Sequence, residues 1–201
     1  MSTIADPQRF QQAIAEFDAI NQEDPNQDTF EGKNYPKELL YSQRMSACLE
    51  RFAPDASEAM QLAARAQHIA RWSIPRSQYP MDRKGYKRWR KELQIFHADK
   101  AKEVLSSLGY EEDLLEQVET LILKKNIKGN PEVQTFEDVI CLVFLEFYLE
   151  DFLNKNQDYT AEKVIKIIQK TWAKMSETGH EAALKLPLSE NALQWVQKAL
   201  A

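Results

Sequence analysis

The sequence predicts an all-α fold, a compact helical bundle of roughly eight helices, and three observations support this prediction. Apolar residues recur at intervals of three and four along most of the chain, which is the spacing of one helix face. No stretch alternates convincingly between apolar and polar residues, as a half-buried strand would. The chain has 201 residues, of which 43% are hydrophobic, so it can bury one sizeable core without needing a second. We therefore predict a single domain over residues 1–201.

The first four helices take their predicted bounds from caps and prolines. Asp6 is a capping residue and Pro7 suits the first helical position, so the first helix begins there. Pro36 opens the second helix and Pro54 ends it. The third helix is rich in alanine, and two prolines stop it before residues 73–83. The predicted ranges are about 7–20, 36–53, 55–72 and 85–108, with the polar segment 21–34 as a loop.

The remaining helices are predicted from apolar stripes and turn residues. Gly109 can adopt the left-handed conformation that ends a helix, and a loop with Pro131 leads into the longest apolar helix. Ser189 is a capping residue for the last helix. The predicted ranges are about 111–126, a sixth helix that follows Pro131, 160–178 and 189–200. We expect the helices of 160–201 to pack on a core formed by about 36–148.

The cysteine usage and the lack of a recognisable targeting signal suggest a soluble cytoplasmic protein without a membrane partner. Cys48 and Cys141 lie far apart among apolar neighbours, as expected for buried thiols in a reducing compartment. The N-terminus lacks a basic stretch followed by an apolar one, and the most apolar run, 139–149, is short. The sequence has no P-loop, no dinucleotide-binding glycine turn, no nucleophile elbow and no H-E-x-x-H pair. Nucleotide hydrolysis by a P-loop, Rossmann redox chemistry and serine-hydrolase chemistry are therefore disfavoured.

Positive charge is concentrated in one segment of an acidic chain. Residues 65–102 carry 11 Lys or Arg against 3 Asp or Glu, while the net charge of the whole chain is −5. This asymmetry suggests a small anionic ligand, although a helix pair with salt bridges to the acidic remainder would produce the same pattern. The acidic net charge argues against DNA and makes RNA a weaker candidate. The candidate substrate-binding residues are Arg65, Arg71, Trp72, Arg76, Tyr79, Arg90 and Lys125.

Three metal-competent side chains are predicted to point inward from three different helices. They are His68, His97 and Asp138. A buried histidine or aspartate needs a partner, because an unpaired buried charge costs several kcal/mol or shifts its pKa. One divalent cation would satisfy all three, and so would ordinary hydrogen bonds. The loop 73–83 is expected to cover this cavity, because its prolines stiffen it while Arg76 and Tyr79 can reach inward.

The order of His68, of His97 in FHADKA and of Asp138 in FEDVICLVFLE resembles the HD-domain superfamily. That resemblance implies an all-α fold and a metal-dependent phosphohydrolase. The residue after His97 is Ala98, where the HD motif has aspartate, and Lys125 stands where some members place a further histidine. The segments PKELLYSQRM, RAQHIARWSIPRSQYP, GYKRWRKEL, FHADKA and FEDVICLVFLE resemble more closely a family of unknown activity, domain of unknown function 4202, over about 36–148.

Two functions of different classes follow as hypotheses. The first is a metal-dependent phosphohydrolase for a small phosphorylated metabolite or nucleotide. In it His68, His97 and Asp138 hold a single divalent metal, one of Mn, Fe, Co or Mg, and arginines such as Arg71 and Arg90 bind phosphate. The alternative is a non-catalytic, HD-like module that binds a nucleotide or RNA through an arginine and aromatic pocket. A scaffold without a small ligand is a third reading of the same charges.

Overall fold

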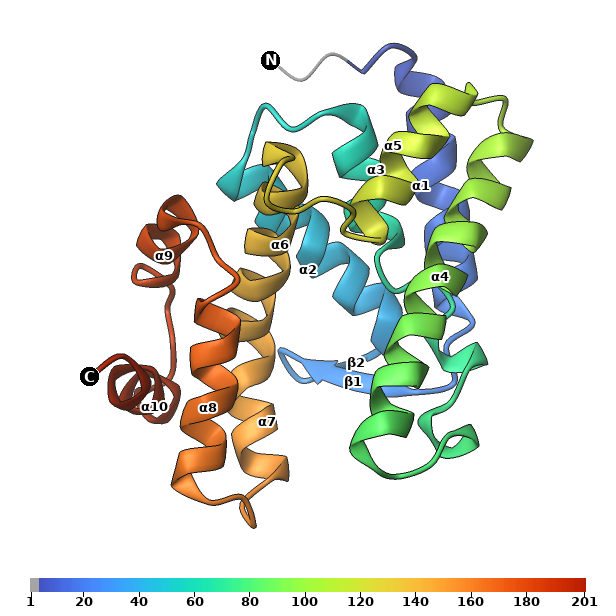
Figure 1. The fold of residues 1–201 in the computed structure, drawn as a ribbon. Coiled ribbons are helices and arrows are strands. Elements are labelled where there is room, and N and C mark those ends of the chain that lie inside the picture. Colours follow the sequence, from blue (N-terminus) through green and yellow to red (C-terminus); the bar gives the residue numbers. More distant parts are fainter. Residues whose placement is uncertain (1–3) are drawn as a thin grey trace. The chain divides into compact units, whose positions relative to one another are not determined.

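The computed structural model describes residues 4–201, and helices dominate it (Figure 1). About 70% of it is helical, in ten α-helices, and the β-structure within residues 4–201 is one two-stranded sheet. The all-α prediction is therefore confirmed. The chain divides into two compact units, one up to Asn126 and one from Ile127 to Ala201. The single domain over 1–201 stays a prediction, because two compact units can belong to one domain or to two.

The first unit contains five helices, a hairpin and two short 3₁₀ turns. In chain order these are α1 (Pro7–Gln22), β1 (Gln27–Phe30), β2 (Lys33–Pro36), α2 (Lys37–Phe52), α3 (Glu58–Ala66), η1 (Arg71–Ser73), η2 (Arg76–Gln78), α4 (Arg83–Ser107) and α5 (Glu112–Ile122). Helix α1 packs against α2, α3 and α4, and α5 packs against α3 and α4. Fully buried side chains from all five helices fill the space between them, among them Phe17, Met45, Leu62, Leu93 and Leu121.

Several predicted helix ends are confirmed at the level of individual hydrogen bonds. The Asp6 carboxylate accepts hydrogen bonds from the backbone N–H groups of Gln8 and Arg9, and Pro7 is the first helical residue. Gly109 has a φ of 73°, which is the left-handed conformation expected beyond the end of α4. These ends depend on local chemistry, because each capping group lies within a few residues of the group that it satisfies.

The prediction that residues 21–34 form a loop is wrong in its second half, where β1 and β2 pair antiparallel. Glu31 and Gly32 have φ values of 50° and 75°, so both central residues of the turn are left-handed, as a two-residue hairpin loop with a type I′ turn requires. The strands are mostly exposed and polar. Because neither face is buried in a core, they show no apolar alternation, and the sequence pattern could not reveal them.

The third helix is shorter than predicted. It ends at Ala66 instead of continuing to Trp72, and a turn leads from there into η1. Ala70 in this turn is left-handed, with a φ of 49°. Its backbone N–H donates to Oδ1 of Asn21, a fully buried side chain of α1, over 3.0 Å. A helix-favouring sequence is thus interrupted by a tertiary hydrogen bond that replaces the helical one.

The second unit contains α6 (Pro131–Val143), a π-helical turn η3 (Phe144–Tyr148), α7 (Leu149–Lys155), α8 (Ala161–Trp172), α9 (Glu177–Ala183) and α10 (Glu190–Leu200). Helix α9 packs against α6, and α10 packs against α7 and α8. Roughly eight predicted helices become ten, because η3 divides the predicted sixth helix and the predicted helix 160–178 stops at Trp172. Ser176 then caps α9, where its side chain accepts from the N–H of Gly179.

No helix of residues 4–201 is both long and apolar enough to cross a bilayer. The most apolar run, at the end of α6, continues into η3 and α7 with Glu146 and Glu150.

Candidate functional site: a histidine cluster in the first unit

Two of the predicted metal-binding residues, His68 and His97, lie side by side in the first unit. His68 belongs to the turn that follows α3, and His97 belongs to the middle of α4. The centroids of their rings are 5.6 Å apart. His97 is only 3% exposed, which confirms that it points inward, and the His68 side chain is 25% exposed. The cluster therefore has one deeply buried imidazole and one that reaches solvent.

The turn after α3 sets the orientation of His97. The Nδ1 atom of His97 lies 2.8 Å from the backbone carbonyl oxygen of Ile69, which can only accept a hydrogen bond. Nδ1 of His97 therefore carries the proton, and the lone pair lies on Nε2. That Nε2 atom is buried and has no hydrogen-bond partner among the described residues. A buried polar atom without a protein partner is uncommon in folded proteins, and a water molecule, an ion or a ligand can satisfy it.

Two residues of α2 complete the cluster, and the sequence analysis missed their role. Glu38 is 6% exposed, and its Oε2 lies 3.2 Å from Nδ1 of His68. The Tyr41 ring stacks on the His68 ring, with centroids 4.0 Å apart and planes within 14°. The signal that was available is the spacing: Glu38 and Tyr41 are three residues apart on the face of α2 that also buries Met45. An acidic residue on a buried stripe needs a partner, and Glu38 has two, His68 and Arg71.

Burial and neighbouring charges keep both imidazoles neutral. The pKa of His97 is lowered to about 3, mainly by burial and then by the nearby His68, while the hydrogen bond to Ile69 and the Glu38 carboxylate oppose this shift. Burial also lowers the pKa of His68 well below its usual value, and the positive charges of Arg71, Lys124, Arg90 and Lys37 add to this effect. In the same environment burial raises the pKa of Glu38, against the influence of Arg71 and Lys37. Neutral imidazole is the form that binds metals or accepts protons.

Arg71 connects the histidine cluster to the aromatic residues of α4. Its Nε lies 3.7 Å from Oε1 of Glu38, and its guanidinium sits over the Trp89 ring, 4.8 Å from the centroid. Trp89 is itself held by a hydrogen bond from its Nε1 to the carbonyl of Ile74, 2.8 Å long. Arg90 is exposed one residue further along α4. Of the predicted phosphate-binding residues, Arg71 and Arg90 are the ones whose charges act on the His68 ring.

The loop 73–83 is held by hydrogen bonds among its own residues and by hydrogen bonds to α4. Arg76 donates hydrogen bonds to the backbone carbonyls of Tyr79, Pro80 and Asp82, at 2.9, 2.6 and 3.3 Å. The Tyr79 hydroxyl donates to Glu92 on α4. The Arg76 side chain thus stabilises the loop itself and the Tyr79 side chain joins the loop to α4, and their binding to a ligand stays a prediction.

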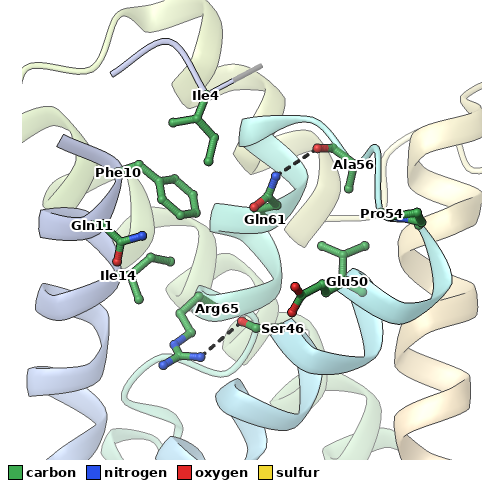
Figure 2. Close-up of a pocket in the computed structure, with 12 residues that line it drawn as sticks. Ile4, Phe10, Gln11, Ile14, Ser46, Glu50, Pro54, Ala56, Gln61 and Arg65 are labelled. Atoms are coloured by element: carbon green, nitrogen blue, oxygen red, sulfur yellow. Dashed lines mark hydrogen bonds between the residues drawn. The ribbon is translucent and has the colours of Figure 1, made fainter. Parts of the chain in front are cut away.

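Arg65 lies outside the histidine cluster and lines a cavity of about 350 Å³, formed by α1, α2 and α3 and shown in Figure 2. Its guanidinium makes two hydrogen bonds to the Asp18 carboxylate, at 2.7 and 2.6 Å, and one to Ser46. Lys125 is exposed and pairs with Glu119 over 2.6 Å. Trp72 is half-buried in η1. The structure shows Arg65 and Lys125 in salt bridges, and a role for either in substrate binding stays a prediction.

Asp138 belongs to the second unit, where it is 2% exposed, as its predicted inward position requires. Its carboxylate accepts hydrogen bonds from the Ser176 backbone N–H at 2.7 Å, from the Ser176 hydroxyl at 2.5 Å and from Gln134 at 3.1 Å. These bonds join α6 to the start of α9. Its sharing of a metal with the two histidines stays a prediction. Within residues 4–201, no three His, Cys, Asp or Glu side chains lie in an arrangement that could hold a metal ion.

A protein-family model matches residues 11–196, which is nearly the whole chain. The chain belongs to the family Domain of unknown function (DUF4202). No curated protein and no solved structure matches it. The family resemblance predicted from the motifs between residues 36 and 148 is confirmed, and the match extends through α8 and α9 into α10.

The cluster of this DUF4202 chain has the chemistry of a ligand site. Metal-binding histidines almost always donate their second ring nitrogen to a carboxylate or a backbone carbonyl. Glu38 faces the second nitrogen of His68, and the Ile69 carbonyl faces that of His97. The residues present therefore fit two of the ligands of a metal ion. The positive charges of Arg71, Lys124, Arg90 and Lys37 act on His68, which favours an anion at the same place.

Proposed function

We propose that this protein is a phosphohydrolase that acts on a small phosphorylated metabolite or nucleotide at the histidine cluster, with one divalent metal. The observation that carries the proposal is the pairing of two neutral imidazoles, each anchored through Nδ1, with an excess of positive charge. Anchored neutral imidazoles suit a metal, and arginines suit the oxygens of a phosphate. Metal-dependent phosphate-ester chemistry uses both together.

His68 and His97 would hold the metal through their Nε2 atoms. The order of these residues along the chain resembles that of HD-domain proteins, and this resemblance gives Asp138 the role of the third ligand. The hydrogen bonds from Ser176 to the Asp138 carboxylate would then have to break. When bound, such a metal supplies Lewis acidity that lowers the pKa of a water molecule toward neutrality. Asp99, the carboxylate nearest to the HD position in sequence, is exposed, while Ala98 is buried. Mn, Fe, Co and Mg are the metals to test.

The chain's own residues bind and orient the phosphate. Arg71 offers a guanidinium whose plane is fixed by Trp89 and whose Nε faces Glu38. A fixed guanidinium forms two parallel hydrogen bonds to phosphate oxygens, which holds the ester in one orientation. Arg90 adds a second positive charge from α4, and Lys124 and Lys37 add charges that act on the same imidazole. The dianionic charge of a phosphate monoester would be balanced by these groups.

A second candidate is a binding module without hydrolysis, and the charge excess around His68 favours it specifically. Four cations act on this imidazole, and they would repel a metal that arrived without an anion. In this case a nucleotide would place its phosphates near Arg71, with Trp89 and the exposed Tyr86 close by for stacking. RNA remains the less favoured ligand, because the chain carries a net charge of −5.

The deciding experiment combines metal analysis with a screen for released phosphate. Purified protein is loaded with Mn²⁺, Fe²⁺, Co²⁺ or Mg²⁺, and nucleotides and sugar phosphates are offered as substrates. We expect about one metal per chain and turnover of a subset of substrates. His97→Ala should remove both. His180→Ala is the matched control, because His180 lies in α9 and stacks on Trp172.

The same samples separate the two candidates. A binding module would hold no metal and release no phosphate, yet a nucleotide would raise its melting temperature through mass action. Arg71→Ala should abolish that shift. If neither a metal nor any phosphorylated compound changes the melting temperature, both candidates are refuted and the basic segment is structural.

A further inference from the structure

Helix α2 fixes the ring of His68 from two directions. Oε2 of Glu38 lies 3.2 Å from Nδ1 of the imidazole, which is within reach of a hydrogen bond. The Tyr41 ring stacks on the imidazole at 4.0 Å and 14°, which prevents the ring from tilting. Glu38 and Tyr41 are one turn apart on the same helix face. One rigid element thus restrains both the position and the rotation of the imidazole.

Glu38 is itself held in place. Its backbone N–H donates to Oδ2 of the buried Asp24 over 3.0 Å, which fixes the first turn of α2. Its second carboxylate oxygen, Oε1, lies 3.7 Å from Nε of Arg71. The two oxygens therefore face different partners, His68 on one side and Arg71 on the other. If Glu38 served only as the ion-pair partner of Arg71, its Oε2 would not need to lie next to an imidazole nitrogen.

From this geometry we infer that Glu38 is a positioning residue that holds His68 in the tautomer with its proton on Nδ1 and its lone pair on Nε2. His97 is in the same tautomer, because its Nδ1 faces a carbonyl oxygen. Both imidazoles then offer the same nitrogen, Nε2, to a ligand. The inference rests on the proposed function only in that the ligand is a divalent metal. The tautomer itself is a property of the metal-free protein.

The first test measures the tautomers directly. Long-range nitrogen-proton NMR spectra of metal-free protein at neutral pH distinguish a protonated Nδ1 from a protonated Nε2 in each ring. We expect the Nδ1–H form for His68 and for His97. In Glu38→Gln the amide can donate as well as accept, so His68 should become a mixture of both forms or change to Nε2–H. His97 should keep its tautomer, because its partner is a backbone carbonyl, and it serves as the internal control.

The second test measures metal affinity. Loss of a partner that orients a ligating histidine weakens metal binding by about 10- to 100-fold. We expect Glu38→Gln to lose affinity for Mn²⁺ or Co²⁺ within this range and Glu38→Asp to recover part of it, because aspartate restores an acceptor. Glu50→Gln is the matched control, since Glu50 is an exposed carboxylate on the same helix. Circular dichroism verifies that each variant is folded.

The outcomes distinguish this inference from the proposed function. If His68 is in the Nε2–H form in the metal-free protein and the protein nevertheless binds metal, the role of Glu38 is refuted and the proposed function is not. An Nδ1–H tautomer that depends on Glu38, in a protein that binds no metal, supports the positioning role and refutes the metal-dependent function. If Glu38→Gln changes neither the tautomer nor the metal affinity, Glu38 serves only as a partner for Arg71 and the inference is wrong.

Discussion

Lowering the pH should destabilise the metal-free protein more than the titration of its exposed groups alone would, because His97 is buried in its neutral form. The pKa of His97 is about 3 in the folded protein and about 6.5 in the unfolded chain. Between these pH values the unfolded state binds one more proton than the folded state does. The free energy of unfolding therefore falls as the pH is lowered through this window.

The size of the effect follows from the two pKa values. Each proton that only the unfolded state binds costs about 1.4 kcal/mol per pH unit below an unfolded pKa of about 6.5, so His97 removes about 2 kcal/mol between about pH 7.5 and about pH 5. This figure hardly depends on how far below pH 5 the folded pKa lies. His68 acts in the same direction, since its pKa is also lowered. Glu38 acts in the opposite direction, because its pKa is raised and its folded form takes up a proton more readily.

A comparison of variants isolates the contribution of His97. His97→Asn keeps a donor near the place of Nδ1 for the Ile69 carbonyl and removes the titrating ring. Urea unfolding with a chelator present, at several pH values between about 7.5 and 5, should show that this variant loses about 2 kcal/mol less than the wild type over that range. His180→Asn, outside the cluster, should keep the wild-type slope. Equal slopes for His97→Asn and wild type would refute the burial of a neutral imidazole at this position.

Three further predictions concern residues that stabilise the interior of one unit or the other. Gly179→Ala should lower the free energy of unfolding by about 1–3 kcal/mol in a urea titration, because the added Cβ would lie 2.7 Å from Oδ1 of Asp138; unchanged stability would show that the α6–α9 contact is loose. Asn21→Ala should cost about 1–3 kcal/mol in the same assay, since it leaves the buried N–H of Ala70 without its acceptor. Ala70→Gly should instead stabilise the protein by about 0.5–1 kcal/mol, because glycine adopts a φ of 49° without strain, and a loss of stability would contradict this.

Local chemistry in the sequence determined most of the helices and the direction of several side chains. The caps at Asp6 and Ser189, and the left-handed Gly109, depend on partners only a few residues away. The inward position of His97 followed from helical periodicity, which places residues on a face without any knowledge of the partner helix. Such features can be predicted from one sequence, because the interactions that fix them lie within one or two turns of helix.

Only the tertiary structure decided what the inward-pointing polar residues contact. Glu38 meets His68 across thirty positions of sequence, and Asn21 stops a helix-favouring segment at Ala70 across forty-nine. The Asp138 carboxylate accepts a hydrogen bond from the hydroxyl of Ser176, which is the capping residue of α9. Helical periodicity shows that a side chain is buried, but its hydrogen-bond partner can come from any element that packs against it. The sequence alone therefore predicted that His97 is buried. The partners that determine the chemistry of the candidate site come from the packing of α2 and α4 against the turn that follows α3.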